Sequence, residues 1–276
     1  MDARPEAGRF ACGPDPPPHK LRVSTAPNLR VLNGGHQVDP ELAARVHEAM
    51  DVLQIVFQPV VWAQCPVVYG HEALVRCDDS PLSGPAELFA AAEDAGLVVE
   101  LEQAIRAEIA EALDRLGTQT PVFVNVHPDA LDDRALFDPG SPLAPHADRI
   151  AIEITERAAL DRIEHLPEKM AALRGLGYSI AIDDLGADYQ GLRTFAEINP
   201  DVVKFDMSLV RDIDARPVHA QLLRAMVAMS RDLGIRTVGV GVETDAEREL
   251  LEDLGCDLLQ GFRFARPDWP PAEIAW

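Results

Sequence analysis

Eight short apolar runs alternate along this chain with stretches that have helical periodicity, and nearly every run ends in a polar or acidic residue. The runs span residues 55–61, 67–75, 121–126, 150–155, 179–184, 201–206, 236–243 and 256–262. Several are continuously apolar, as expected of strands that are covered on both faces. The alternation predicts an α/β fold, a TIM-type (β/α)8 barrel, in which functional side chains gather at the C-terminal ends of the strands.

The stretches between the runs predict helices and one exception to a regular barrel. Helices are expected at residues 86–95, 99–116, 167–176, 189–198, 219–233 and 245–254. Thr244 and Glu247 form a capping-box pattern at the start of the last helix. Too few residues join the first two runs for a crossover helix, so we expect these two strands to pair antiparallel.

The N-terminal segment differs in composition from the rest of the chain. Residues 1–38 are rich in proline and lack periodicity, which predicts a flexible N-terminal arm. Asp39 and Pro40 are typical of an N-cap and a first helical residue. We therefore expect one barrel domain over residues 39–276 that includes this lead-in helix.

Composition narrows the classes of partner. The formal net charge of −21 argues against binding a nucleic acid polymer or an anionic membrane. No apolar run is long enough to cross a bilayer, and the chain start does not have the pattern of a signal peptide. The four cysteines are scattered without a Cys-x-x-Cys pair, which argues against a zinc knuckle or a disulfide framework and favours a cytoplasmic location.

The polar residues at the run ends are candidates for a metal site. They are Glu72, Asn125, Glu153, Asp183, Asp184, Lys204 and Gln260, with Arg76 four residues after Glu72. Carboxylates that converge on a cation recover their desolvation cost, and oxygen ligands without a His or Cys cluster favour a hard cation. Taken singly, each has an ordinary alternative: a solvated charge, a turn cap, a structural ion pair or a complement to a helix dipole.

The order of these motifs resembles the EAL family, the cyclic di-GMP phosphodiesterase domains, over roughly residues 57–267. The matching segments are Phe57-Gln58-Pro59-Val60-Val61, Glu72-Ala73-Leu74-Val75-Arg76, Val124-Asn125-Val126, Glu153-Ile154-Thr155-Glu156, Asp183-Asp184, Lys204-Phe205-Asp206, Gly241-Val242-Glu243-Thr244 and Gln260-Gly261-Phe262. Glu-Ala-Leu alone is common in helices, so the order and spacing carry the resemblance.

The resemblance implies a site that uses Mg2+ or Mn2+. Glu72, Asn125, Glu153 and Asp183 would hold a first ion, and Asp183 with Asp184 would share a second. Lys204 would support the attacking water, while Gln58, Arg76 and Gln260 would contact the ligand. Two ions can activate water for in-line displacement at phosphorus, which would convert cyclic di-GMP to its linear form.

Two segments depart from the family pattern. The family sequence Ala-Glu-Gly-Val-Glu is replaced by Gly239-Val240-Gly241-Val242-Glu243, so valine stands in place of a glutamate implicated in the second metal and in water activation. An isopropyl group has no lone pair and accepts no proton, which leaves Glu243 as the remaining acidic candidate for catalysis. The loop after the fifth run has Ala187 and Asp188 in place of threonine and glycine, although Glu156, which braces this loop in the family, is retained.

Three functions follow as hypotheses. The first is a cyclic di-GMP receptor with weak or absent hydrolysis. The second is an active phosphodiesterase in which Glu243, a water or a rearranged loop compensates for Val240. The third is a protein-interaction module that no longer binds nucleotide; a homodimer or a protein partner is compatible with all three. An unrelated barrel hydrolase would not share this ordered set of motifs.

Overall fold

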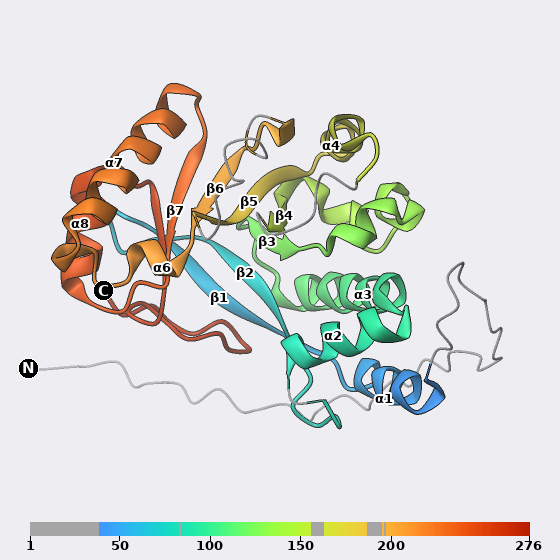
Figure 1. The fold of residues 1–276 in the computed structure, drawn as a ribbon. Helices are drawn as coiled ribbons and strands as arrows, with labels where there is room; N and C mark the ends of the chain where they lie inside the picture. Colours follow the sequence, from blue (N-terminus) through green and yellow to red (C-terminus); the bar gives the residue numbers. More distant parts are fainter. Residues whose placement is uncertain (1–38, 83, 156–162, 187–194, 196) are drawn as a thin grey trace, which may run out of the picture. The chain divides into compact units, whose positions relative to one another are not determined.

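Eight strands form a closed barrel in the computed structural model, which describes residues 39–276 apart from 83, 156–162, 187–194 and 196 (Figure 1). In chain order they are β1 (Gln54–Trp62), β2 (Val68–Arg76), β3 (Val122–Asn125), β4 (Ile150–Thr155), β5 (Ser179–Leu185), β6 (Val202–Phe205), β7 (Arg236–Val240) and β8 (Leu258–Gln260). Strands β2 to β8 pair in parallel, whereas β1 is antiparallel to both β2 and β8. The predicted barrel and its antiparallel first strand are confirmed.

Helices lie outside these strands (Figure 1). The described helices are α1 (Pro40–Met50), α2 (Pro85–Ala95), α3 (Val98–Leu116), α4 (Leu166–Gly175), α6 (Met207–Val210), α7 (Pro217–Asp232) and α8 (Asp245–Leu254). Short 3-10 helices lie between β3 and β4, namely η1 (Pro128–Asp132), η2 (Arg134–Phe137) and η3 (Ala144–Arg149), and between α6 and α7, namely η5 (Ile213–Ala215). Neither α6 nor these short turns was predicted, because segments this short have too little periodicity.

Local capping agrees with the sequence at two helix starts. The Asp39 side chain accepts a hydrogen bond from the Glu41 backbone, and Pro40 is the first residue of α1. Thr244 and Glu247 make the reciprocal capping box at the start of α8. The predicted arm, residues 1–38, and most of the predicted helix at 189–198 lie outside the described residues, so both stay predictions.

Strand β7 is shorter than predicted, and this changes the position of Glu243. The predicted run reached residue 243, but the strand ends at Val240 because Gly241 has a φ of +82°. A side chain on Gly241 would meet Met207 at 2.6 Å, so both the turn and the close packing require glycine. Glu243 therefore lies beyond the strand rather than on it.

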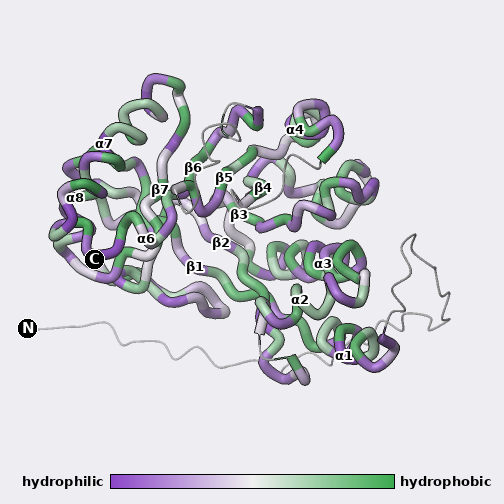
Figure 2. The backbone as a smooth tube through the Cα atoms, in the orientation of Figure 1, coloured by the Kyte–Doolittle hydropathy of each residue, from purple (hydrophilic) through white to green (hydrophobic). Residues whose placement is uncertain are grey.

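Two apolar cores hold the barrel. One lies between the strands and the helices, where amphipathic helices such as α3 carry both hydrophobic and hydrophilic residues (Figure 2). The other lies inside the barrel and comprises Val60, Phe123, Ala151, Ala181, Val202, Val238 and Leu258. Because side chains alternate along a strand, residues two positions away on the same strands also face the interior. The inner core therefore defines which residues line the barrel mouth.

The interior positions nearest the mouth form a ring, with one residue from each strand. This mouth ring consists of Gln58, Glu72, Asn125, Glu153, Asp183, Lys204, Val240 and Gln260. Seven of its members are polar or charged, and Val240 is the exception.

Among the described helices, none is both long and apolar enough to cross a lipid bilayer.

Candidate metal centre

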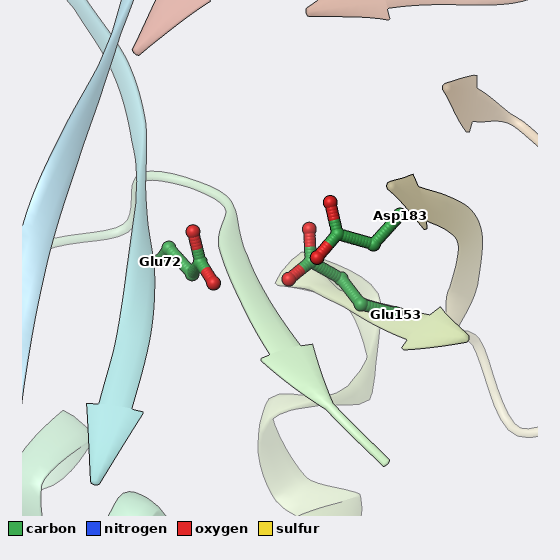
Figure 3. A group of neighbouring side chains, drawn as sticks. All are labelled: Glu72, Glu153 and Asp183. Atoms are coloured by element: carbon green, nitrogen blue, oxygen red, sulfur yellow. The ribbon is translucent and has the colours of Figure 1, made fainter. Parts of the chain in front are cut away.

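Three carboxylates from different strands converge at the barrel mouth. Glu72 lies on β2, Glu153 on β4 and Asp183 on β5, and one oxygen from each lies within 4.8 Å of the others. Figure 3 shows their carboxyl groups pointing toward one another. Residues separated by 81 and 30 positions in sequence meet here because parallel strands direct the same face into one interior.

Lys204 on β6 supplies a positive charge to this cluster. Its Nζ lies 2.9 Å from Oε2 of Glu72, 2.8 Å from Oε1 of Glu153 and 3.7 Å from Oδ1 of Asp183. The Lys204 side chain is only 1% exposed, so these carboxylates replace the water it loses. Three carboxylates and one ammonium give this part of the ring a formal charge of −2.

Three amide side chains complete the polar part of the ring. Asn125 Nδ2 donates to Oε1 of Glu72 at 2.9 Å, and Gln260 Nε2 donates to Oε2 of Glu72 at 2.6 Å. Gln260 Nε2 also donates to Oε1 of Gln58 at 3.1 Å, and Nε2 of Gln58 donates to the Ala265 carbonyl. Glu72 is therefore held by donors from β3, β6 and β8.

Burial and charge shift the acidities of the cluster in different directions. Desolvation raises the pKa of Glu153 well above its ordinary value, and raises the pKa of Asp183, although Lys204 acts in the opposite direction at both. Desolvation also acts to raise the pKa of Glu72, but Lys204 and the donors Gln260 and Asn125 lower it overall. Burial acts to lower the pKa of Lys204, yet the three carboxylates hold it well above its ordinary value.

The donor set fits a divalent cation. Oε2 of Glu153 is fully buried and has no hydrogen-bond partner among the described residues. A buried carboxylate oxygen without a partner is costly unless a proton or a cation satisfies it. Glu72, Glu153 and Asp183, with the amide oxygen of Asn125, offer the hard oxygen ligands that Mg2+ or Mn2+ takes.

Two other predicted site residues that the structure describes, Arg76 and Asp184, are outside the group of three carboxylates. Arg76 is half-buried at the end of β2, and its guanidinium donates to the Val75 carbonyl at 2.7 Å. Asp184 has a φ of +58° at a β-bulge and does not belong to the carboxylate group. Glu156 lies outside the described residues, as do Ala187 and Asp188 of the altered loop.

The structure does not bring Glu243 into the cluster. Its exposed carboxylate accepts a hydrogen bond from Arg211 at 2.6 Å. This bond lowers the pKa of Glu243, with the Arg211 charge contributing further. Arg211 could not be predicted as this partner from the sequence, because the two residues are 32 positions apart and no motif links them.

Val240 occupies the β7 position of the ring. It stands in register with Gln260 on β8 and packs against the apolar interior core. Strand β6, which pairs with β7, carries Lys204 in register with Val238, two residues before Val240. The place at which an eighth polar side chain would face the cluster is therefore apolar.

The fold and this site define a class: an α/β barrel with one reversed strand and a carboxylate–lysine cluster at its mouth. The family model for the EAL domain matches residues 44–267. The chain belongs to the EAL domain family.

Curated relatives include signalling proteins and phosphodiesterases. The signaling protein YkoW of Bacillus subtilis is 28% identical over 247 residues, which cover 86% of this chain and 31% of YkoW. The cyclic di-GMP phosphodiesterase RocR of Pseudomonas aeruginosa is 34% identical over 159 residues, covering 56% of this chain and 41% of RocR. The chain thus spans less than half the length of these relatives.

Solved structures share the fold and carry ligand. BlrP1 of Klebsiella pneumoniae, in a manganese and cyclic di-GMP complex, aligns with a TM-score of 0.70 and 32% identity over 78% of this chain and 56% of that chain. A standalone EAL protein of Vibrio cholerae, in a cyclic di-GMP-bound form, aligns with a TM-score of 0.70 and 26% identity over 81% and 95% of the two chains. Divalent metal and cyclic di-GMP therefore occur together in a protein of this family.

Proposed function

We propose that this chain binds cyclic di-GMP at the barrel mouth together with a divalent ion, Mg2+ or Mn2+, and hydrolyses it weakly or not at all. The observation that carries the proposal is Val240 within an otherwise polar ring. Binding is supported by the retained carboxylates and amides, and weak turnover by the apolar β7 position.

Each retained residue has a role in this proposal. Glu72, Asn125, Glu153 and Asp183 would hold the ion, which when bound supplies positive charge for phosphate oxygens and acidifies a water. Lys204 keeps its charge because the surrounding carboxylates raise its pKa. Gln58, Arg76 and Gln260 would contact the dinucleotide, with Arg76 exchanging its present bond to a backbone carbonyl for a phosphate or a base.

Weak turnover follows from what Val240 and Glu243 can do. Valine neither ligates a second ion nor accepts a proton, and the loss of a general base commonly costs about 10²- to 10⁴-fold in rate. Glu243 would have to leave its ion pair with Arg211 to act in its place. Asp184 would also lack a second oxygen ligand from β7 for a second ion, because valine stands at position 240.

An active phosphodiesterase is the second candidate. Relatives named as cyclic di-GMP phosphodiesterases, such as RocR, favour it. The two candidates share ligand binding and differ only in product formation. If cyclic di-GMP does not bind at all, a protein-interaction module becomes the better interpretation.

Calorimetric titration of the full chain with cyclic di-GMP tests the binding half of the proposal. We expect binding in Mn2+ and a large loss of affinity after EDTA treatment or in Asp183→Asn. The matched control is Asp253→Asn, the same substitution at an exposed position of α8, which should bind like the unaltered chain. Equal affinity with and without metal, or no binding in metal, would contradict the proposal.

A further inference from the structure

A buried network of ion pairs outside the mouth ring connects α3 to the chain segment that follows β3. Glu102 and Arg106 lie one turn apart on α3 and are 2% and 5% exposed. Arg106 Nη1 lies 3.3 Å from Oε2 of Glu102, and Arg106 Nη2 pairs with Asp133. None of these three residues belongs to the mouth ring.

The other oxygen of Glu102 holds the backbone. Oε1 accepts a hydrogen bond from the His127 N–H at 2.9 Å. His127 is the N-cap of η1, where the chain leaves the barrel. Burial raises the pKa of Glu102, against the opposing effects of the His127 N–H and of Arg106.

His127 lies only two residues beyond Asn125, the last residue of β3. Between them, the Val126 N–H donates to the carbonyl of Glu153 at 3.0 Å. Asn125 itself directs its Nδ2 to Oε1 of Glu72, which leaves its amide oxygen for another partner. The hydrogen bond from the His127 N–H to Glu102 therefore holds the backbone two residues after Asn125, a side chain of the candidate metal centre.

Stability alone does not explain this network. Replacing a buried ion pair by apolar side chains of similar size is often neutral or stabilising, so the burial of Glu102 and Arg106 is weak evidence that the pair stabilises the fold. Mutation of a residue that orients a metal ligand without itself binding the metal commonly lowers the metal affinity by about 10- to 100-fold.

We propose that Glu102 is a positioning residue that holds the β3 terminus, and thereby Asn125, in place for the divalent ion. This inference rests on the proposed metal site. It assigns a function to a helix residue that makes no direct contact with the carboxylate cluster among its described hydrogen bonds.

A matched pair of double variants isolates the hydrogen bond to His127. Glu102→Met with Arg106→Met and Glu102→Gln with Arg106→Met both remove the buried ion pair. Only the second keeps an oxygen that can accept the His127 N–H. Both variants also remove the Arg106 partner of Asp133, so they share that loss and differ only in the side chain at residue 102.

The measurement is the Kd for Mn2+ alone, by titration of the full chain, alongside the thermal unfolding midpoint. We expect the Met-Met variant to bind Mn2+ about tenfold more weakly than the Gln-Met variant. Asp133→Asn, which weakens the far end of the network, should leave the Kd for Mn2+ within about twofold of the unaltered chain while lowering the midpoint.

Two results would overturn the inference in distinguishable ways. Equal Mn2+ affinity in the two double variants would reject the positioning role and leave the metal site intact. Absence of Mn2+ binding by the unaltered chain would reject the metal site and the positioning role together. If the Met-Met variant does not fold, Glu102→Gln and Asp133→Asn are compared with the unaltered chain. A free energy of Mn2+ binding that falls in Asp133→Asn by as much as its free energy of unfolding would also reject the positioning role.

Discussion

Val240 on β7 stands in register with Gln260 on β8, and Gln260 donates a 2.6 Å hydrogen bond to Glu72 of the carboxylate cluster. An aliphatic side chain thus sits beside a residue that contacts the cluster directly. The strand geometry places a side chain at this position whatever its chemistry, so one substitution can change the chemistry of the ring without altering the barrel.

Restoring an acid at this position should restore turnover. We predict that Val240→Glu creates or increases hydrolysis of cyclic di-GMP by about 10²-fold or more, because it supplies the missing oxygen ligand and base. Product formation by chromatography measures the effect. Val240→Gln is the matched control, with similar size but no basic carboxylate, and should stay near the level of the unaltered chain. Unchanged activity in Val240→Glu would mean that the altered loop or another defect dominates.

Removing the internal cation should destabilise the metal-free protein. Lys204→Met leaves the buried carboxylates without their positive partner, so we expect the free energy of unfolding in EDTA to fall by about 3–5 kcal/mol. Lys169→Met removes a surface partner of Asp132 and should cost about 1 kcal/mol or less. Urea unfolding measures both, and equal losses would contradict the role of Lys204.

The loss of unfolding free energy in Lys204→Met should also depend on pH. Burial raises the pKa of Glu153 and of Asp183 in the fold, so the folded state binds protons at these groups more tightly than the unfolded chain does. Stability from these two groups is therefore present at low pH and is lost as pH rises through their raised folded values. The deficit of Lys204→Met should shrink as pH falls toward the ordinary carboxyl pKa, and a deficit that grows would contradict this assignment.

The cysteines should differ in reactivity. Burial raises the pKa of the Cys256 thiol to about 11, and its side chain is enclosed beside β8. The thiolate is the reactive form, so Cys256 should resist a thiol reagent at pH 8 until the protein unfolds. Among the described cysteines, half-buried Cys65, in the turn between β1 and β2, should react before the buried Cys77 and Cys256. Mass spectrometry of the labelled peptides gives the order, and early labelling of Cys256 would contradict the packing.

The α8 capping box offers a test of stability apart from the site. Thr244→Ala removes the side-chain oxygen that accepts from the Glu247 N–H, and should lower the free energy of unfolding by about 1 kcal/mol. Affinity for Mn2+ should not change, because neither residue contacts the cluster. Thr244→Ser keeps the hydroxyl and serves as the control. A change in Mn2+ affinity without a change in stability would contradict this separation.

The sequence predicted the barrel because its strands are repeated apolar runs with clear ends. It also predicted that Glu72, Asn125, Glu153, Asp183 and Lys204 would share one site, since strand ends of a barrel converge. The structure places these five in direct contact or within one cluster.

What the sequence could not supply was conformation between and beyond the strands. A φ of +82° at Gly241 moves Glu243 off the strand, and the ion pair with Arg211 joins residues that no local pattern links. The buried Glu102 on α3 looked like any charged helix residue, because burial of a single charge is set by tertiary packing. The flexible arm, the cytoplasmic location and a homodimer or protein partner stay predictions.

In the proposed function, the site holds cyclic di-GMP without efficient cleavage. Incubating the chain, in molar excess over cyclic di-GMP and with Mn2+, and separating the nucleotides by chromatography over time tests it most directly. We predict that the ligand is bound yet stays cyclic over a period in which a named phosphodiesterase such as RocR consumes it. Prompt and complete conversion to the linear dinucleotide in this incubation would contradict the proposed function.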